Sequence, residues 1–479
     1  MSKRRAYHSC DVKNVVPEKL SLGAPDGGVT VGLDIGKLEI FAVLRWNDGT
    51  FERPWKVRNP SEIMMLVRLL QNIAQERPVT VAMESTGTYG DALRQALTDN
   101  RLDVHRVSGK ACHDYSEIFD GVPSSHDGKD AAIVAELTAI GKSWPWPYQQ
   151  KSEQDAKLAY LVDRLDAHQT IQMTWIGRLE ALVARHWPEV TRLLRLTSVS
   201  LLKTLSHYGG PMALARDPDA AQRLAGWGRH VLKGDKIDKV LRSAAATSGV
   251  RQNDQDILQL KEYAACALAA LREVQGARRE LTELAKGNEV IRRQAEVVGT
   301  VTACVLWSSL GDPNDYHCSE AYRKAMGLNL KERSSGKHKG QLKITKRGPA
   351  IVRRWMYFAA LRHVQDPLVK GWFESKKARD GGRGKGAVIA VTRRLALALY
   401  NVGVGGELFE SWRLFPGSST ARRSLQSQQK ACGQPEKVSA MARQKGPPLP
   451  PSPPHRPQRA LGEGRCDGEG GRGSRVPCS

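Results

Sequence analysis

Val29-Thr-Val-Gly-Leu-Asp-Ile-Gly-Lys37 is the stretch of sequence that decides the fold. It alternates apolar residues with smaller ones, ends on Asp34 and stops at Gly36. Alternation of this kind predicts a buried β-strand, here with one carboxylate at its tip. A single acid at a strand end is most often a solvated or capping residue. The prediction of a site therefore depends on further acids at matching positions.

The residues on either side predict a mixed α/β domain. Asn47-Asp-Gly49 predicts a hairpin turn, because Asp-Gly tolerates positive φ, and Asn59-Pro-Ser-Glu62 predicts the capped start of a helix. Further strands are expected at 40–44, near 51–57, at 79–84 and at 104–107. Two later helices are expected, around 90–97 and over 133–140.

Three more acids lie where this domain could gather them. Glu84 again ends a predicted strand, and Asp127 and Asp130 stand three apart, which places both carboxylates on one helix face. Each has an ordinary explanation as a strand end, cap or first-turn acid. Together they favour a site for Mg²⁺ or Mn²⁺, because crowded carboxylates need cations between them and hard oxygens suit these ions. Two such ions can clamp the attacking and leaving oxygens of a phosphodiester.

The charge of the chain points to a polyanionic partner. Lys and Arg number 73 against 50 Asp and Glu, a formal net charge of +23 over 479 residues. Residues 417–479 contribute +7, so +16 remains on the first 416 residues. A basic body is typical of proteins that bind nucleic acid. The eight cysteines include no Cys-x-x-Cys pair, which argues against a zinc site or a disulfide framework and fits the cytoplasm.

Neither end of the chain indicates a membrane. The N-terminus has no apolar signal region, and no apolar run is expected to span a bilayer, so the chain reads as soluble and intracellular. Residues 417–479 contain no aromatic residue and are rich in Pro and Gly, which predicts a disordered basic tail.

The middle of the chain predicts long helices. Apolar residues recur in steps of three and four from Leu158 to Leu182, with a polar step at His168 and Gln172, and again over 257–281. This is coiled-coil spacing. Two interpretations stay open: an antiparallel pair of helices within one chain, or a dimerisation arm whose polar steps set the register. His168 fits a register residue better than a metal ligand.

A basic segment follows at 331–347, with seven Lys or Arg residues, and Pro349 then opens a helix. We expect it to follow phosphates; a merely solvated run of charges is the alternative. Ser334 and Ser335 lie within it as polar loop residues, with no base nearby in sequence. The candidate nucleic-acid-binding residues are Lys337, Lys339, Lys343, Lys346, Arg347 and Arg353.

Several of these segments together resemble a known family. The acids stand in Gly-Leu-Asp34-Ile-Gly-Lys, Met-Glu84-Ser-Thr-Gly-Thr-Tyr and His-Asp127-Gly-Lys-Asp130-Ala, and Ser335-Gly336 precedes Ile344-Thr-Lys-Arg-Gly348. In these motifs the chain resembles the DEDD insertion-sequence transposases, relatives of the Piv DNA invertase with a RuvC-like, RNase H-fold N-terminal domain. The resemblance covers residues 29–415 and is strongest at its two ends. His126, where the family usually has Thr, and Val298-Gly-Thr-Val, in place of a Pro-Gly-Ile-Gly hairpin, depart from it.

The resemblance implies a reaction and its residues. Asp34, Glu84, Asp127 and Asp130 are expected to hold the divalent metal, and Ser335 to attack the DNA phosphate and hold it as a covalent phosphoserine ester. Ser334 is the alternative nucleophile. The implied activity is site-specific DNA recombination that moves an insertion sequence, at the nucleoid. Two other classes stay open: a metal nuclease that only cuts, such as a junction resolvase, and a non-catalytic nucleic-acid-binding protein.

The implied partners are donor and target DNA, a noncoding bridge RNA transcribed from the element, and further copies of the chain in a dimer or tetramer with composite sites. The expected fold is an α/β RNase H-like (RuvC-like) domain, a helical coiled-coil middle and a mainly α-helical transposase domain. The expected segments are a flexible leader (1–27), the RuvC-like domain (28–150), the helical region (151–295), the transposase domain with the serine (296–416) and the tail (417–479).

Overall fold

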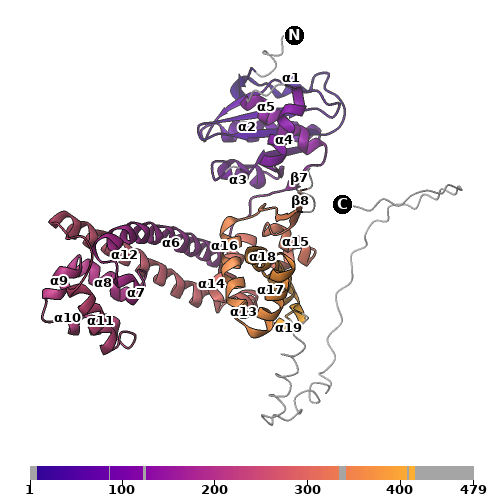
Figure 1. The fold of residues 1–479 in the computed structure, drawn as a ribbon. Helices are drawn as coiled ribbons and strands as arrows, with labels where there is room; N and C mark the ends of the chain where they lie inside the picture. The colour runs from indigo at the N-terminus through magenta and orange to yellow at the C-terminus, as the bar shows by residue number, and fades with distance from the viewer. Residues whose placement is uncertain (1–7, 86, 122–125, 334–340, 407–408, 416–479) are drawn as a thin grey trace, which may run out of the picture. The chain divides into compact units, whose positions relative to one another are not determined.

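The computed structural model of the chain forms two compact units (Figure 1). One comprises the chain up to Arg292 together with Ala303–Gly311, and the other comprises Arg293–Thr302 and the chain from Asp312 on. The first begins with a mixed α/β region and the rest of the chain is mostly helical, as the sequence predicts. The structure describes residues 8–85, 87–121, 126–333, 341–406 and 409–415.

A seven-stranded sheet forms the centre of the α/β region. Its strand order is β1-β4-β3-β2-β5-β6-β7. β2 and β3 pair antiparallel, with Asp34 opposite Phe41, whereas β5 and β6 continue parallel to β2. Gly49, in the turn after β3, has a φ of 92°, as the predicted hairpin requires. The strands are β1 (Cys10–Asp11), β2 (Val29–Ile35), β3 (Glu39–Arg45), β4 (Trp55–Arg58), β5 (Val79–Glu84), β6 (Asp103–Val107) and β7 (Ser143–Pro145).

Different helices cover the two faces of this sheet. Leu33 of β2 and Met83 of β5 belong to the main apolar core, which α2 and α3 complete on one face. Ala82 packs instead in a second cluster with α5 on the other face, which we call the α4/α5 face. Because side chains alternate along a strand, Asp34 and Glu84 also lie on the α4/α5 face. The helices are α2 (Ile63–Glu76), α3 (Asp91–Asp99), α4 (Gly109–Asp120) and α5 (Asp127–Ala139).

Helix α5 lies very close to β2 because Gly32 has no side chain. A β-carbon at Gly32 would stand 2.0 Å from the carbonyl oxygen of Ala131 and 2.4 Å from the amide nitrogen of Ala135. Atoms cannot approach that closely, so only glycine allows the packing. Arg45 on β3 and Glu136 on α5 add an ion pair at 2.5 Å that holds the helix on the sheet. The strand that carries Asp34 is thus in direct contact with the helix that carries the Asp127/Asp130 pair.

The expected flexible leader, residues 1–27, is wrong for its described part. Cys10–Asp11 pairs in parallel with β4 at the edge of the sheet, and a short helix, α1 (Pro17–Ser21), follows. The physical reason is Val12, which is buried in the main apolar core between these two elements. Val15, Leu20 and Ala24 also pack against this core, but their irregular spacing gives no periodicity that a sequence pattern could reveal.

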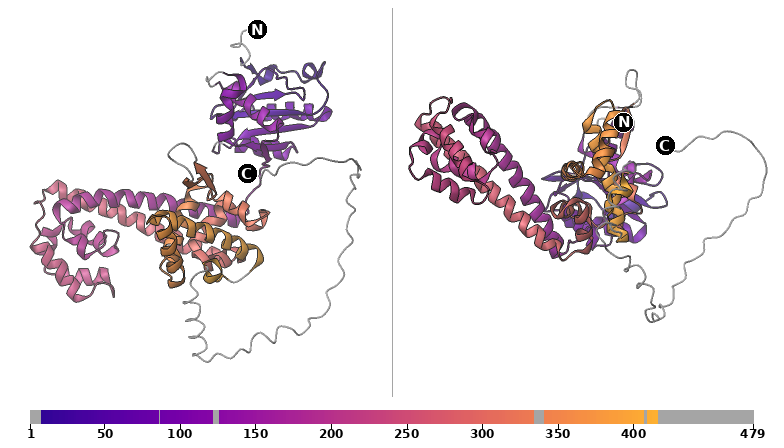
Figure 2. Two further views of the ribbon diagram at one scale, coloured as in Figure 1. Left: turned by 45° about the vertical axis from the view of Figure 1, so that its right-hand side comes forward. Right: turned by 60° about the horizontal axis from the view of Figure 1, so that its bottom comes forward.

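A helical hairpin makes up the rest of the first unit (Figure 2). Its long helices are α6 (Glu153–His186) and α12 (Asp254–Ala285), joined through five short helices. Three contacts show that α6 and α12 run antiparallel. Arg164 contacts Glu273, Trp175 contacts Tyr263 (ring centroids 5.1 Å) and His186 contacts Asp256, so residues later in α6 meet residues earlier in α12. The repeat of apolar residues is accounted for by this pairing within one chain. The short helices are α7 (Val190–Leu193), α8 (Val199–Tyr208), α9 (Pro211–Arg216), α10 (Ala220–Gly228) and α11 (Gly234–Ala245).

The second unit is built around one apolar helix, α18. By length and composition α18 could cross a membrane, contrary to the expectation that the chain has no such run. Its residues Val391, Leu395 and Leu399 are fully buried and pack against the neighbouring helices, which makes α18 the core helix of this unit. The elements around it are α15 (Ser319–Ala325), β8 (Leu330–Arg333), β9 (Gln341–Ile344), α16 (Ala350–His363), α17 (Pro367–Arg379), α18 (Gly384–Gly405) and α19 (Ser411–Leu414); α13 (Glu289–Val298) and α14 (Thr300–Leu310) connect the units in sequence.

Candidate functional site

Four carboxylates gather on the α4/α5 face. Asp34 lies near the end of β2, Glu84 ends β5, and Asp127 and Asp130 lie in the first turn of α5. Burial raises the pKa of Asp34 to about 6, and the charges of Asp130, Asp127 and Glu84 act in the same direction. Burial also raises the pKa of Glu84, helped by Asp130, and that of Asp130, helped by Asp127. The structure therefore brings together the four acids that the sequence singled out.

Helix α4, which the sequence analysis did not predict, closes one side of this cluster. A β-carbon on Gly109, its first residue, would stand 2.0 Å from Oε1 of Glu84. Cys112, in the following turn, is also near the acids. Burial raises the pKa of its thiol to about 12, and the charges of Glu84, Asp130 and Asp34 add to the shift. The thiol is therefore neutral and adds no further negative charge to the cluster.

Lys129 and His126, two neighbours of the aspartates in the sequence, act against the repulsion among the acids. Lys129, between the two aspartates of α5, is 1% exposed and its ammonium donates to Asp120 of α4 at 2.7 Å. Lys129 and His126 both lower the pKa of Asp130. Sequence reasoning missed Lys129, although a lysine inside Asp-Gly-Lys-Asp was a visible signal. His126, the departure from the family pattern, is the N-cap residue of α5.

Asn59 joins the two turns that follow the acid-bearing strands. Its Nδ2 donates to the carbonyl oxygens of Gly36, after β2, at 3.0 Å and of Tyr89, after β5, at 3.3 Å. The predicted capping role of Asn59 is wrong: α2 begins at Ile63. The side chain of Asn59 instead fixes the two loops beside Asp34 and Glu84 relative to each other.

The donor set fits a hard divalent cation by its chemistry. Within the described part of the chain, no group of three or more His, Cys, Asp or Glu side chains is arranged to hold a metal ion. Burial is the largest cause of the raised pKa of Asp34, Glu84 and Asp130, and repulsion from the neighbouring acids adds to it. A divalent cation among them would remove that repulsion. Asp34 at the end of β2, Glu84 at the end of β5 and the two aspartates of the first turn of α5 are the residues that would hold such an ion.

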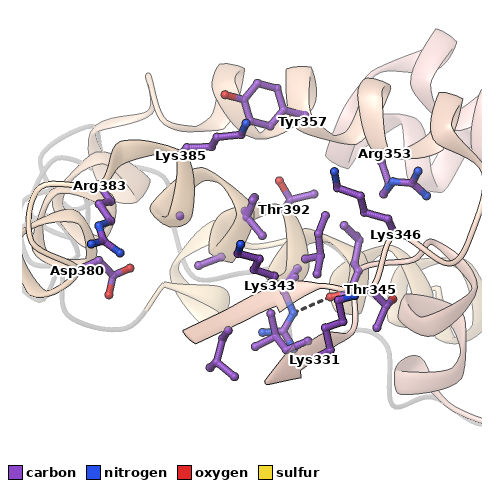
Figure 3. A pocket seen from close by; sticks show the side chains of 18 of the residues that line it. Lys331, Lys343, Thr345, Lys346, Arg353, Tyr357, Asp380, Arg383, Lys385 and Thr392 are labelled. Carbon is purple, nitrogen blue, oxygen red and sulfur yellow. Dashed lines mark hydrogen bonds between the residues drawn. The ribbon is translucent and has the colours of Figure 1, made fainter. Parts of the chain in front are cut away.

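A separate basic cavity of about 1120 Å³ lies within the second unit (Figure 3). The described residues that line it include nine Lys or Arg and a single acid, Asp380. They come from β8, from β9 and the segment that follows it, from α16, α17 and α18, and from the turn between α17 and α18. The nine are Lys331, Lys343, Lys346, Arg353, Arg354, Lys376, Arg383, Lys385 and Arg393.

Three of the predicted nucleic-acid-binding residues, Lys343, Lys346 and Arg353, line this basic cavity. Arg347 does not line it; its backbone packs against Gly327, where a β-carbon would stand 3.0 Å away. The sequence analysis did not single out Arg383 and Lys385, which also line the cavity. Four candidates, Ser334, Ser335, Lys337 and Lys339, lie outside the described residues and join β8 to β9 in the sequence.

The Ile344-Thr-Lys-Arg-Gly348 motif is anchored through its backbone. The amide of Thr345 donates to Asn329 O at 2.7 Å, and that of Lys346 donates to Gly327 O at 3.0 Å. A β-carbon on Gly348 would stand 2.3 Å from the carbonyl oxygen of Ala325. The glycine of the motif therefore has a packing role, which brings the segment that follows β9 against the end of α15.

Comparisons with known proteins find similarity to transposases in two parts of the chain. Residues 31–188 match a DEDD family model of the IS110 type described as "Transposase", and residues 290–371 match the model described as "Transposase IS116/IS110/IS902 family". A relative, "Transposase for insertion sequence element IS1111A" of Coxiella burnetii (strain RSA 493 / Nine Mile phase I), is 33% identical over 109 residues. That alignment covers 21% of this chain and 30% of the relative, so it spans under a third of the relative's length.

The first match contains all four acids, and the second contains the basic segment with its serines and the Gly348 motif. The two models describe parts of one family of transposases and occur here in one chain. On these grounds the chain belongs to the IS110 family of DEDD transposases.

Proposed function

We propose that this chain is the transposase of an insertion sequence and acts as a site-specific recombinase that cuts and rejoins DNA. The observation that carries the proposal is the gathering of Asp34, Glu84, Asp127 and Asp130 on one face of the sheet, where the pKa values of Asp34, Glu84 and Asp130 are raised. The sheet supports an RNase H-like assignment of the RuvC type, because an antiparallel β2–β3–β4 meander continues into parallel β5 and β6.

The four acids would hold one or two Mg²⁺ or Mn²⁺ ions. Such ions, when bound, stabilise negative charge on phosphate oxygens as Lewis acids. The chain's own residues prepare the site for them. Lys129 and His126 favour the ionised form of Asp130, and the neutral Cys112 thiol does not compete with the carboxylates for positive charge. Asp34 is ionised above a pH of about 6, which is the form that binds a cation.

Ser335 is the proposed nucleophile, with Ser334 as the alternative. The serine oxygen would form a bond to phosphorus as the phosphodiester P–O bond breaks, and the released DNA hydroxyl would take a proton. Attack of a DNA hydroxyl on the phosphoserine ester would reverse these changes and rejoin the strand. Cationic side chains of the same unit, such as Lys346 and Arg353, support this role because they can neutralise a phosphate.

The proposed partners are donor and target DNA, a noncoding bridge RNA from the element, and further copies of the chain as a dimer or tetramer. The formal net charge of +23 supports polyanionic partners, and a nucleoid location follows from DNA binding. Pairing of α6 with α12 within one chain uses the apolar repeat, so an oligomer would need other surfaces of the helical hairpin or of the second unit.

One reaction tests the proposal. The full chain is incubated with Mg²⁺, the noncoding RNA that flanks the element and both DNA sites, and protein–DNA adducts are resolved on a denaturing gel. We expect an adduct that Ser335→Ala abolishes, that Ser334→Ala leaves in place, and that Asp34→Asn also prevents.

Two outcomes would contradict the proposal in different ways. Cleavage without an adduct, with Ser335→Ala as active as the wild type and Asp34→Asn inactive, would identify a metal nuclease of the junction-resolvase kind. DNA or RNA binding with no cleavage under any condition, and unchanged by both substitutions, would identify a non-catalytic binding protein.

A further inference from the structure

The cations of the basic cavity stand on two sides of it. Lys343 comes from the β8–β9 ribbon, and Lys346 and Arg353 come from the segment that follows the ribbon and from α16. Arg383 lies across the cavity from Lys346 and Arg353, on the turn between α17 and α18 (Figure 3). Lys385, in the first turn of α18, points into the space between them. A chain of phosphates inside the cavity would therefore meet positive charge on both sides.

The ribbon holds two lysines in a position that costs stability without a ligand. Lys331 on β8 is the direct cross-strand partner of Lys343 on β9, and both side chains are exposed and line the cavity. Like charges directly opposite each other destabilise a two-stranded ribbon. An anion between the two ammonium groups would remove that cost. The pairing therefore indicates a phosphate-binding position on the ribbon.

The opposite wall is a turn built from glycines with room around it. Gly381 and Gly382 have φ values of 66° and 80°, a conformation that glycine adopts without strain. Asp380 is engaged by Lys376 at 2.6 Å, which leaves the wall cationic at Arg383 and Lys385. No heavy atom would lie within 4 Å of a β-carbon on Gly384, so a ligand can approach the backbone closely there.

The floor of the cavity is apolar, which a duplex backbone would not need. Leu342 is 59% exposed and Leu330 is 38% exposed, and both line the cavity with Ile389, whereas the ring of Tyr357 lies beside Lys385 on the side away from the ribbon (Figure 3). A duplex presents phosphates and sugars to a protein surface and keeps its bases stacked. An unpaired strand can place a base on apolar or aromatic side chains while its phosphates bind cations. The cationic walls fit the phosphates of such a strand, and the apolar side chains fit an unpaired base.

Arg393 adds a cation at the base of the cavity. Its Nε donates to the carbonyl oxygen of Leu328 at 2.9 Å, so the guanidinium is fixed in place. Burial lowers the pKa of Arg393, and the charge of Arg323 acts in the same direction. A phosphate nearby would offset the repulsion between these two arginines.

We propose that the basic cavity binds an unpaired nucleic-acid strand, with phosphates between the ribbon and the α17–α18 turn and a base on the apolar floor. Arg383, Lys385 and Leu342 are the residues that this assignment adds. It rests on the proposed function, in that a nucleic acid is the polyanion. It goes further in naming the unpaired form of the strand and in assigning a wall that lies beyond the matched segment 290–371.

Fluorescence anisotropy on the full chain tests the assignment. The probes are a labelled single strand, the same strand annealed to its complement, and an abasic strand of equal length. We expect R383A/K385A to weaken binding of the single strand by about tenfold and to reduce the salt slope by about 1 to 2. Duplex affinity should change less than about twofold, because duplex phosphates do not enter the cavity. The matched control is K324A/K370A, which removes two exposed positive charges from the same unit outside the cavity.

Leu342→Ala separates the base from the phosphates. It should weaken binding of the single strand about fivefold or more and leave the abasic strand unaffected, since base contacts are worth roughly 1–3 kcal/mol each. Val404→Ala, which truncates an exposed apolar side chain of the same unit outside the cavity, is the control. Unchanged circular dichroism and thermal unfolding establish that each variant is folded.

Equal single-strand affinity for R383A/K385A and wild type would overturn the proposal, as would an equal loss for duplex and single strand. A loss for the abasic strand in Leu342→Ala would also overturn it. The outcome is distinct from that of the adduct experiment. Single-strand binding that depends on Arg383 and Lys385, in a protein that forms no adduct, would support this assignment and contradict the recombinase. An adduct in a protein whose single-strand binding does not depend on these residues would contradict this assignment and support the recombinase.

Discussion

Oε1 of Glu84 occupies the space that a β-carbon on Gly109 would need, at 2.0 Å from the position of that atom. The strand tip of β5 and the first residue of α4 are thereby matched to each other. Gly32 shows the same kind of contact on β2, but there the opposing atoms belong to the backbone of α5. Substitution of the two glycines should therefore have different effects. The Glu84 carboxylate can rotate away from a new side chain at Gly109, whereas the backbone of α5 cannot rotate away from one at Gly32.

Gly109→Ala should impair metal binding with little effect on folding. The added methyl would turn the Glu84 carboxylate out of the cluster, which costs only a side-chain rotation. We expect Mg²⁺ affinity, measured by calorimetry, to fall about tenfold or more, with the free energy of unfolding changed by less than about 1 kcal/mol. Gly90→Ala is the control, since a β-carbon there meets only ordinary contacts at 3.5 Å or more. Equal Mg²⁺ affinity in Gly109→Ala and wild type would show that Glu84 is not a ligand.

Asp34 should make the metal-free protein more stable as the pH falls from about 7 to about 4. Its folded pKa of about 6 lies above the ordinary 3.8, so in this window the folded state holds a proton that the unfolded state has released. The loss of stability caused by the Asp34 carboxylate is therefore complete above about pH 6 and absent below the ordinary pKa of 3.8. Asp34→Asn should therefore raise the unfolding free energy near pH 7.5 by on the order of 1 kcal/mol, after allowance for partial exposure of the carboxylate.

Mg²⁺ should reverse this comparison. Bound ion stabilises the folded wild type near pH 7.5, whereas Asp34→Asn lacks one ligand and should gain little. Thermal unfolding of both proteins with and without Mg²⁺, at pH 5 and at pH 7.5, measures the effect. A stabilisation by Mg²⁺ that is equal at both pH values, or equal in the two proteins, would contradict a role for the Asp34 carboxylate.

Lys129→Met should destabilise the α/β region strongly. The ammonium is 1% exposed and bonded to Asp120, and its loss leaves a carboxylate in partly buried surroundings without its partner. We expect a cost of about 3 kcal/mol in urea unfolding, and recovery of much of it in Lys129→Met/Asp120→Leu, where no unpaired charge stays behind. Lys110→Met is the control. Lys110 pairs with Asp114 at 2.6 Å, but both side chains are more than half exposed, so its loss should cost less than about 1 kcal/mol. Similar costs for the two lysines would show that burial does not decide the effect.

The sequence was sufficient for what depends on local pattern. Asp34 and Glu84 were identified because strand alternation places an acid at each tip, and Asp127 with Asp130 because their spacing puts them on one helix face. Helix α4 was missed because none of its residues is buried, so it lacks the apolar stripe by which a helix is recognised. Asn59 was assigned to a cap because its tertiary partners, Gly36 and Tyr89, lie far from it in sequence.

The lack of a local signal also explains why only part of the basic cavity was predicted from the sequence. Lys343, Lys346 and Arg353 were predicted because they cluster in sequence, whereas Arg383 and Lys385 reach the cavity only through the packing of α16, α17 and α18. No local signal shows which of two basic segments will face each other. Likewise the spacing of the apolar repeat could not decide between pairing within one chain and pairing between chains, since both bury the same residues.

Gly32→Ala should be far more damaging to the fold than Gly109→Ala. The methyl would need space now taken by Ala131 O and Ala135 N, so α5 would have to move off β2. We expect the free energy of unfolding of the α/β region to fall by about 3 kcal/mol or more, with loss of Mg²⁺ binding because Asp127 and Asp130 move with the helix. Gly177→Ala, on α6 with no atom within 4 Å of its β-carbon, should instead stabilise its helix by about 0.5–1 kcal/mol. If Gly32→Ala unfolded like the wild type and still bound Mg²⁺, the close packing of α5 on β2 would not be what positions the two aspartates beside Asp34.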